Sequence, residues 1–160
     1  MNMMDMKEIS KRPRIGLIGG SKAGKKFLEI AEDVGRLVAE RGGVLVCGGM
    51  AGVMEAACRG AKEAGGLTVG IIPGAKRADA NAWVDIAIAT GMGYTRNALV
   101  VMNSDAIIAV DGAYGTLSEI AYAMIHEKKV IGLGTWEIEG VVAAKNPKDA
   151  VARAFASVKE

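Results

Sequence analysis

Aromatic residues, histidine, cysteine and proline are all scarce in this chain of 160 residues. Aromatics make up 4% of the sequence, so a hydrophobic core must consist mainly of Ala, Val, Ile, Leu and Met. One histidine, His126, and two cysteines, Cys47 and Cys58, supply too few ligands for a His/Cys metal site, and no metal is expected. The two thiols are predicted to be small buried hydrophobic side chains, which suits a reducing compartment.

The chain also lacks long apolar runs and a large charge of either sign. No stretch approaches the roughly 20 apolar residues that span a bilayer, and the N-terminal residues lack the apolar middle of a signal peptide. The 20 basic and 18 acidic residues leave a net charge of +2, too little to recruit nucleic acid or an anionic membrane. We therefore expect a cytoplasmic protein with neither a nucleic acid nor a membrane among its partners.

Glycine and small aliphatic residues are abundant instead, and short apolar runs alternate with helical patterns. Strands are predicted over 14–19, 44–47, 67–72, 84–89, 105–110 and 129–133, and helices over 22–41, 53–64, 94–102, 115–127 and 147–158. This alternation predicts a Rossmann-like α/β fold, with a doubly wound, mainly parallel sheet and helices on both faces. A single domain is expected over 13–160, after a flexible segment over 1–12. Segment 134–145 has no clear pattern, and its Trp136 is expected to pack against the last helix or else to cover a pocket.

Three glycine-rich turns follow predicted strand ends. Because the carboxyl ends of parallel strands meet at one edge of the sheet, these turns are expected to border a single ligand site. At the third turn, the unpaired N–H groups of a helix N-terminus would bind an anion such as phosphate, close to the Thr116 hydroxyl and the Glu119 carboxylate. The candidate binding residues are Gly19, Gly20 and Ser21 in the first turn, Gly48, Gly49 and Gly52 in the second, and Gly112, Ala113, Tyr114, Gly115 and Thr116 in the third.

The first two turns allow more than one interpretation. Residues 19–26 approach the phosphate-loop pattern G-x-x-x-x-G-K-[ST], but Lys26 stands where a magnesium-binding hydroxyl is needed, so hydrolysis of a nucleoside triphosphate is not predicted. The pattern G-x-G-x-x-G is absent from this turn, which argues against NAD and FAD. Ser21 is either a helix cap or a ligand contact. The glycines of the second turn indicate a close approach to a ligand or a tight connection, and Met54 is expected in the core.

Three motifs in order along the chain carry a resemblance to a known family. Gly48-Gly-x-x-Gly-x-Met54, then Arg96, then Gly112-Ala-Tyr-Gly-Thr-Leu-Ser-Glu119 resemble the lysine-decarboxylase-like family, now named for the LOG phosphoribohydrolases. The resemblance spans residues 14–133 and is closest to the short branch that includes molybdenum-cofactor carrier proteins. It implies hydrolysis of the N-glycosidic bond of a nucleoside 5′-monophosphate to a free base and ribose 5-phosphate, with no cofactor required.

By this resemblance Arg96 and Glu119 would be the catalytic pair. Arg96 would position the substrate and hold Glu119 ionised, and the carboxylate would stabilise positive charge on the sugar and activate water. The third turn departs from the enzymes, whose Pro-Gly-Gly-x-Gly-Thr is replaced here by Asp111-Gly-Ala113-Tyr-Gly-Thr116. Asp111 must therefore point away from a bound phosphate, be neutralised, or face a different ligand, and the turn must accommodate the Cβ of Ala113.

Two other classes of function remain open beside hydrolysis, namely a non-catalytic carrier of molybdenum cofactor and a nucleotide sensor. A hydrolase requires Arg96 and Glu119 at one cavity, whereas a carrier requires a wider and more basic pocket. In each class the partner is a small phosphorylated ligand: a nucleotide, phosphate or molybdenum cofactor. The resemblance also implies a homodimer or homotetramer, and glycine-rich apolar helices suit close packing between subunits.

Overall fold

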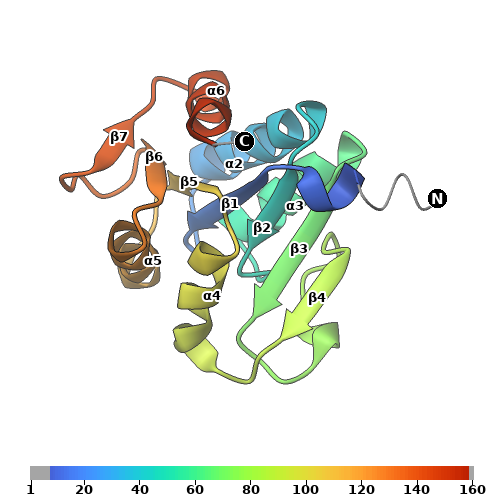
Figure 1. The fold of residues 1–160 in the computed structure, drawn as a ribbon. Helices are drawn as coiled ribbons and strands as arrows, with labels where there is room; N and C mark the ends of the chain where they lie inside the picture. The colour runs from blue at the N-terminus through green and yellow to red at the C-terminus, as the bar shows by residue number, and fades with distance from the viewer. Residues whose placement is uncertain (1–7, 159–160) are drawn as a thin grey trace.

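A parallel sheet lies between two layers of helices in the computed structural model, which describes residues 8–158 (Figure 1). Within that range seven strands form the sheet in the order β4-β3-β2-β1-β5-β6-β7, and each neighbouring pair is parallel. The predicted Rossmann-like fold is confirmed. Residues 8–11 of the expected flexible segment are helical, and residues 1–7 lie outside the described part of the chain.

Helices α2, α3 and α6 cover one face of the sheet, and α4 and α5 cover part of the other (Figure 1). The strands are β1 (Arg14–Gly19), β2 (Val44–Cys47), β3 (Leu67–Ile72), β4 (Ile86–Ala89), β5 (Ala106–Val110), β6 (Lys129–Leu133) and β7 (Val141–Ala143). The α-helices are α2 (Lys25–Glu40), α3 (Val53–Glu63), α4 (Asn97–Met102), α5 (Tyr114–Ile125) and α6 (Pro147–Ser157). Two short 3-10 helices span Arg77–Asp79 and Gly93–Arg96.

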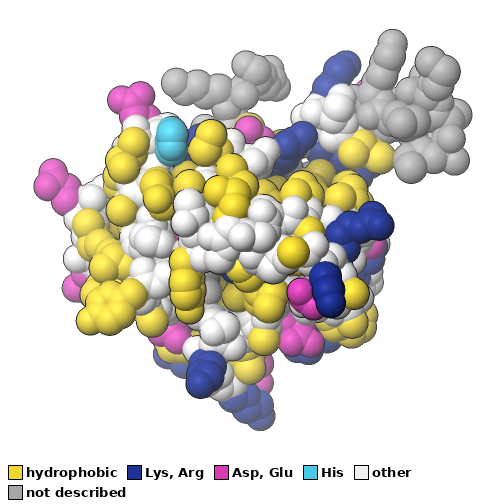
Figure 2. Space-filling view, turned by 90° about the horizontal axis from the view of Figure 1, so that it is seen from below, with side chains coloured by type: hydrophobic (Ala, Val, Ile, Leu, Met, Phe, Trp, Pro, Cys, Tyr) yellow, Lys and Arg dark blue, Asp and Glu magenta, His cyan; other side chains and the backbone are white. Residues whose placement is uncertain are grey.

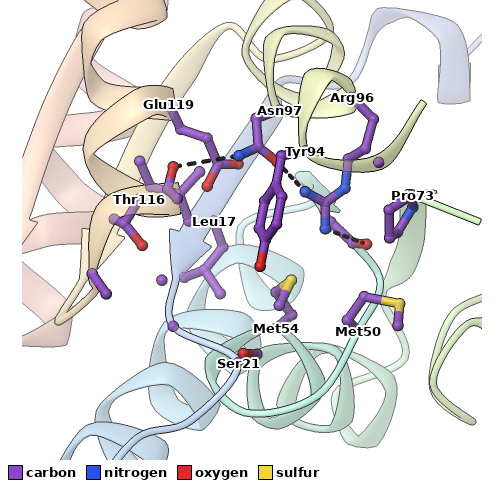
Figure 3. Close-up of a pocket in the computed structure, with 17 residues that line it drawn as sticks. Leu17, Ser21, Met50, Met54, Pro73, Tyr94, Arg96, Asn97, Thr116 and Glu119 are labelled. Carbon is purple, nitrogen blue, oxygen red and sulfur yellow. Dashed lines mark hydrogen bonds between the residues drawn. The ribbon is translucent and has the colours of Figure 1, made fainter.

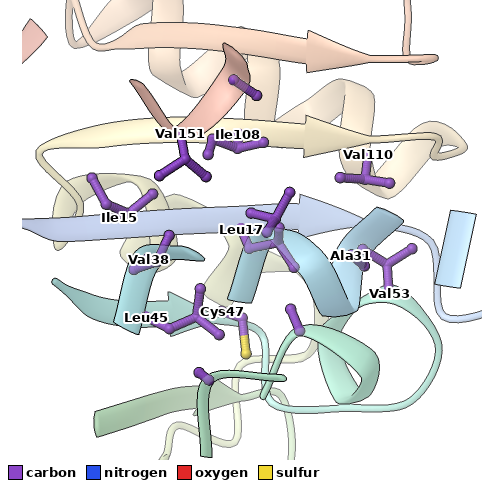
Figure 4. Packing of buried hydrophobic residues seen from close by; sticks show 14 of the residues in the cluster. Ile15, Leu17, Ala31, Val38, Leu45, Cys47, Val53, Ile108, Val110 and Val151 are labelled. Carbon is purple, nitrogen blue, oxygen red and sulfur yellow. The ribbon is translucent and has the colours of Figure 1, made fainter. Parts of the chain in front are cut away.

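The central strands are apolar along their whole length because both of their faces are buried. In β5, Ile108 and Val110 belong to the hydrophobic cluster under α2, α3 and α6, whereas Ile107 and Ala109 belong to the cluster under α4 and α5. Figure 4 shows the first cluster, in which Leu17 of β1 lies close to side chains of the neighbouring strands and of α2. Burial on two sides therefore explains why these strands read as continuous apolar runs.

Helices α2 and α3 pack backbone to backbone through two glycines. A Cβ placed on Gly35 would lie 1.9 Å from the carbonyl oxygen of Ala57, and a Cβ on Gly60 would lie 2.0 Å from that of Glu32. Neither distance is compatible with a side chain, so both positions require glycine. The close packing of glycine-rich helices that the sequence suggests between subunits thus occurs here within one chain.

Most predicted elements are confirmed, and the differences are local. The segment 134–145, which has no clear pattern in the sequence, contains the missed strand β7, a short edge strand that is only partly buried. The predicted helix over 94–102 is divided into the 3-10 helix Gly93–Arg96 and α4. Asn146 caps α6 as the sequence indicates, because its side-chain oxygen accepts a hydrogen bond of 2.8 Å from the backbone N–H of Asp149.

The order of the strands places a ligand site between β1 and β5. From β1 the chain proceeds through β2 and β3 to β4 on one side, and β5 then returns to pair with the other side of β1. In doubly wound sheets, ligands bind beyond the carboxyl ends of the strands at such a reversal. The turns after β1 and β5, which carry two of the predicted glycine motifs, meet at this position.

Candidate active site

A cavity of about 440 Å³ lies at the carboxyl ends of β1 and β5 (Figure 3). Its volume falls within the range of roughly 300–1,000 Å³ that is common for small-molecule sites. Residues from all three glycine turns line it, together with both members of the predicted catalytic pair. The predicted site residues that line the cavity are Gly19, Gly20, Ser21, Gly48, Arg96, Ala113, Gly115, Thr116 and Glu119.

The remaining predicted residues, Gly49, Gly52, Gly112 and Tyr114, are not among the lining residues. The three glycines have positive φ angles of 73°, 70° and 112°, a backbone region that favours glycine. A Cβ on Gly52 would lie 2.4 Å from the carbonyl oxygen of Gly20, so the second turn packs directly against the first. These glycines are therefore required by contacts within the chain, which supports the interpretation of a tight connection.

Gly48 does line the cavity, and its lack of a side chain makes room for Arg96. A Cβ at this position would lie 2.6 Å from Nη2 of Arg96 and 2.9 Å from Sδ of Met54. The carbonyl oxygen of Gly48 instead accepts a hydrogen bond of 3.4 Å from Nη2 of Arg96. The second turn thus contributes to the site chiefly by allowing the arginine to approach.

Arg96 is buried and held by neutral groups. Its Nε donates a hydrogen bond of 2.9 Å to the carbonyl oxygen of Ile71, and its Nη1 donates to Oδ1 of Asn97. Asn97 in turn donates from Nδ2 to Oγ of Ser118 at 3.1 Å, which connects α4 to α5. Burial lowers the pKa of Arg96, but arginine keeps its charge in proteins, so a fixed cation forms one wall of the cavity.

Glu119 enters the same cavity from α5, with 7% of its surface exposed. It accepts no hydrogen bond from any residue within 8–158. Burial raises the pKa of Glu119 to about 8, and the attraction of Arg96 offsets only part of this effect. Arg96 thus favours the ionised form of Glu119, as expected, but burial outweighs this effect. The guanidinium donates its hydrogen bonds to Ile71, Gly48 and Asn97 and none to the carboxyl group. Burial therefore favours the protonated form of Glu119, whose carboxyl group faces the cavity.

The N-terminus of α5 is arranged to bind an anion. Its N-cap residue, Ala113, has no side chain that could bond to the free N–H groups of the first turn. Gly115 and Thr116 of that turn line the cavity, so their side of the helix is accessible to a ligand. The helix dipole also favours negative charge at this end. This geometry supports the prediction of a phosphate site.

The backbone of Asp111 takes an unusual conformation. Its φ angle is +52°, its N–H donates to the carbonyl oxygen of Leu133 at 3.1 Å, and its own carbonyl oxygen accepts from Oγ1 of Thr135 at 2.7 Å. Asp111 is not among the residues that line the cavity. Of the three alternatives raised by the sequence, the structure therefore favours a carboxylate that points away. Proline, with φ fixed near −65°, cannot take this conformation, so the turn differs from a Pro-Gly-Gly turn.

Several lining residues were missed by sequence reasoning. Met50, Met54 and Pro73 give one part of the cavity an apolar wall. Met54 is also part of the hydrophobic core, as predicted. Asn97 directly follows Arg96 and Tyr94 precedes it by two residues, and a tyrosine so near a motif arginine in a chain poor in aromatics was a usable signal. Trp136 does not pack against α6, because its Nε1 donates to the carbonyl oxygen of Ala113 at 3.0 Å and its ring lies 6.0 Å from that of Tyr114.

The two cysteines are buried as predicted, with 3.5 Å between their sulfur atoms. Within residues 8–158 no group of three His, Cys, Asp or Glu side chains is placed to hold a metal ion. No helix in the same range is long and apolar enough to cross a membrane.

Comparisons with known proteins agree with the geometry. A model of the SLOG cluster4 family matches residues 12–159. An uncharacterized protein of Archaeoglobus fulgidus is 47% identical over 139 residues, which are 86% of this chain and 91% of that protein. A cytokinin riboside 5′-monophosphate phosphoribohydrolase of Mycobacterium tuberculosis is 34% identical over 69% of this chain, and the match spans 64% of the enzyme. The solved structure of a molybdenum cofactor binding protein from Rippkaea orientalis superposes with a TM-score of 0.88 at 36% identity, over 93% of this chain and 99% of that protein.

Proposed function

Because this chain belongs to the SLOG cluster4 family, we propose that it is a cytosolic phosphoribohydrolase that cleaves nucleoside 5′-monophosphates to free base and ribose 5-phosphate. The observation that carries the proposal is the convergence of Arg96 and Glu119 on one cavity beside a helix N-terminus. The mycobacterial relative named for this reaction supports it. Among residues 8–158, Arg96 is the one basic side chain that lines the cavity, which favours a hydrolase over a carrier with a broadly basic pocket.

In the proposed complex the 5′-phosphate lies on the N-terminus of α5. There the free N–H groups and the Thr116 hydroxyl donate to its oxygens. The sugar then lies next to Glu119, one turn further along the same helix. Arg96 provides a fixed positive charge on the opposite side of the cavity and orients the polar groups of the ligand.

The raised pKa of Glu119 suits the order of proton transfers in this reaction. As the bond from C1′ to the base breaks, its electron pair leaves with the base, which takes a proton from neutral Glu119. The resulting carboxylate faces the positive charge that develops on the sugar and stabilises it. It then accepts a proton from the water that attacks C1′, which restores the neutral acid and completes ribose 5-phosphate.

The test is to incubate the purified protein with a panel of nucleoside 5′-monophosphates and to follow free base by chromatography. We expect base release to depend on the 5′-phosphate and to be abolished by Glu119→Gln. The rate of release should decline as the pH rises above about 8, because Glu119 then loses its proton. Phosphate binding should survive in that variant, because its carboxamide leaves the N-terminus of α5 intact. Undiminished release by Glu119→Gln would refute the role assigned to this residue.

A second function, the carriage of molybdenum cofactor, is favoured by two observations. The conformation of Asp111 separates this turn from the Pro-Gly-Gly turn of the enzymes, and the molybdenum cofactor binding protein of Rippkaea orientalis matches nearly the whole chain. For a carrier the same helix N-terminus would hold the phosphate of the cofactor as cargo. Saturable binding of phosphorylated ligands without release of any base would support the carrier, or a nucleotide sensor, over the hydrolase.

A further inference from the structure

Tyr94 lines the cavity although 83% of its surface is exposed. It belongs to the 3-10 helix Gly93–Arg96, so the element that places the buried Arg96 also places this ring. Figure 3 shows the ring across the middle of the cavity, between Glu119 and Thr116 on one side and Arg96 and Pro73 on the other. An aromatic ring that lines the cavity and is largely exposed is accessible to a ligand in that cavity.

The ring of Tyr94 lies between α5 and an apolar wall. A Cβ on Gly115 would lie 3.9 Å from Cε1 of Tyr94, an ordinary van der Waals distance, so the ring is next to the first turn of α5. Met50, Met54 and Pro73 form that wall. Methionine and proline present flat or adaptable apolar surfaces, and methionine sulfur makes favourable contacts with aromatic rings.

The cavity therefore has two chemically different parts. One part has the helix N-terminus, Thr116 and Glu119, which suit a phosphate and a sugar. The other has Tyr94, the apolar wall and the guanidinium of Arg96. These groups suit a flat ring system with polar atoms at its edge, because aromatic side chains stack on heterocyclic bases through their π faces. A small molecule that fills both parts must carry a phosphate at one end and a planar heterocycle at the other.

We propose that the ring of Tyr94 is the stacking surface for the planar heterocycle of the ligand and thereby determines which phosphorylated compounds the cavity accepts. This inference rests on the proposed function, since it assumes a phosphorylated ligand on α5. Stacking tolerates many heterocycles, because every such ring has a π face. Tyr94 therefore selects for the presence of a ring, and the polar groups around it select among rings.

Tyr114 offers a matched control for this inference. It is exposed to nearly the same extent, 80%, and lies only one residue from the cavity-lining Gly115. Its ring, however, lies 6.0 Å from that of Trp136 and is not among the groups that line the cavity. Removal of either tyrosine ring takes a similar exposed surface from the protein, but only the removal of Tyr94 should affect a bound heterocycle.

The experiment compares AMP with ribose 5-phosphate, which has the same phosphate and sugar but no base. Affinities are measured by isothermal titration calorimetry with Glu119→Gln protein, in which AMP is not consumed. We expect AMP to bind more tightly than ribose 5-phosphate. Tyr94→Ala should weaken AMP binding by about tenfold to a hundredfold, the usual effect of removing a stacked aromatic ring. The affinity for ribose 5-phosphate should stay unchanged. Tyr94→Phe should restore the preference for AMP, and Tyr114→Ala should not alter it.

Each other result has a distinct meaning. If the Glu119→Gln protein with Tyr94 intact binds AMP and ribose 5-phosphate with equal affinity, the inference of a stacking site is wrong and the phosphate site still stands. If neither compound binds, the proposed function and this inference fail together. A Tyr94→Ala protein with unchanged AMP affinity but an altered mass in light scattering would assign the tyrosine to a contact between chains, and the inference would be wrong.

Discussion

The pKa of Glu119 is raised mainly by burial, and the attraction of Arg96 offsets only part of this effect. The motif identifies this glutamate as a site residue, and the structure brings it to the same cavity as Arg96. The sequence could not show that Arg96 is occupied by two backbone carbonyl groups and Asn97, because that arrangement requires β2, β3 and α4 to be in place. The identity of the pair was therefore predictable, and the charge of its acidic member was not.

The raised pKa of this single residue, Glu119, can be tested by the pH dependence of the protein's free energy of unfolding. Folding raises the pKa of Glu119 from its ordinary value of 4.5 to about 8. Between these values the folded chain holds a proton that the unfolded chain has lost. The contribution of Glu119 to the free energy of unfolding is therefore complete below about pH 4.5. Between about pH 4.5 and 8 it declines by up to about 1.4 kcal/mol for each pH unit, and above pH 8 it stays low.

Glu119→Gln carries no titrating group at this position, so it should be more stable than the unsubstituted protein above about pH 8. Urea denaturation at about pH 6 and pH 9 measures the difference. Glu137→Gln changes an exposed carboxylate in the same way and should keep the pH dependence of the unsubstituted protein. Identical pH profiles for all three proteins would show that Glu119 is not desolvated on folding.

At the scale of elements, the patterns that are readable in the sequence are those that burial creates. The strands of the sheet centre are buried on both faces and appear as apolar runs, and α2 has a clear amphipathic pattern. Strand β7 leaves no such trace because it is a three-residue edge strand with one exposed residue. The 3-10 helix Gly93–Arg96 could not be separated from α4 either, since both share one helical pattern in the sequence.

The packing of α2 on α3 can be tested with Gly60→Ala, a substitution with two opposite effects on stability. Alanine is the better helix former, so Gly60→Ala should gain about 1 kcal/mol from intrinsic propensity. Its Cβ would however lie 2.0 Å from the carbonyl oxygen of Glu32, a backbone atom that cannot move without a shift of α2. We expect the clash to outweigh the gain and the variant to lose about 1 to 3 kcal/mol, as overpacked cores do.

Thermal denaturation measures this effect, with Gly24→Ser as the comparison. Gly24 is the N-cap of α2, has an extended conformation that other residues adopt, and has open space around its Cβ position. Serine is a preferred N-cap residue, so this variant should be at least as stable as the unsubstituted protein. A Gly60→Ala protein that melts at or above the temperature of the unsubstituted protein would contradict the proposed backbone contact.

At the scale of the whole molecule, the side of the sheet that carries α4 and α5 is incompletely covered. Figure 2 views the molecule from this side and shows hydrophobic side chains gathered across it. Ile86 and Ile88 of β4 are 49% and 46% exposed, and Met102 of α4 and Ile125 of α5 are 53% and 72% exposed. Large apolar residues gathered on one side commonly mark a surface of association.

We propose that this side mediates the assembly of the chain into a homodimer or homotetramer. Size-exclusion chromatography with light scattering should give a multiple of the chain mass of 16.6 kDa. Ile88→Lys places a charge on the exposed side of an edge strand and should shift the population toward the monomer without loss of the fold. A mass of one chain for the unsubstituted protein at every concentration would refute the assembly.

The contacts of Gly35 with Ala57 and of Gly60 with Glu32 also have an evolutionary consequence. Each glycine is required by a backbone atom of the opposite helix, and neither lines the cavity. Relatives that keep the same distance between α2 and α3 should therefore conserve both glycines whatever they bind, and should lose them only together. By contrast, 83% of the Tyr94 side chain is exposed, so packing among residues 8–158 leaves it free to change when the ligand changes. Within this family, an invariant glycine on these helices would record the fixed distance between α2 and α3, while variation at position 94 would mark where relatives have diverged in what they bind.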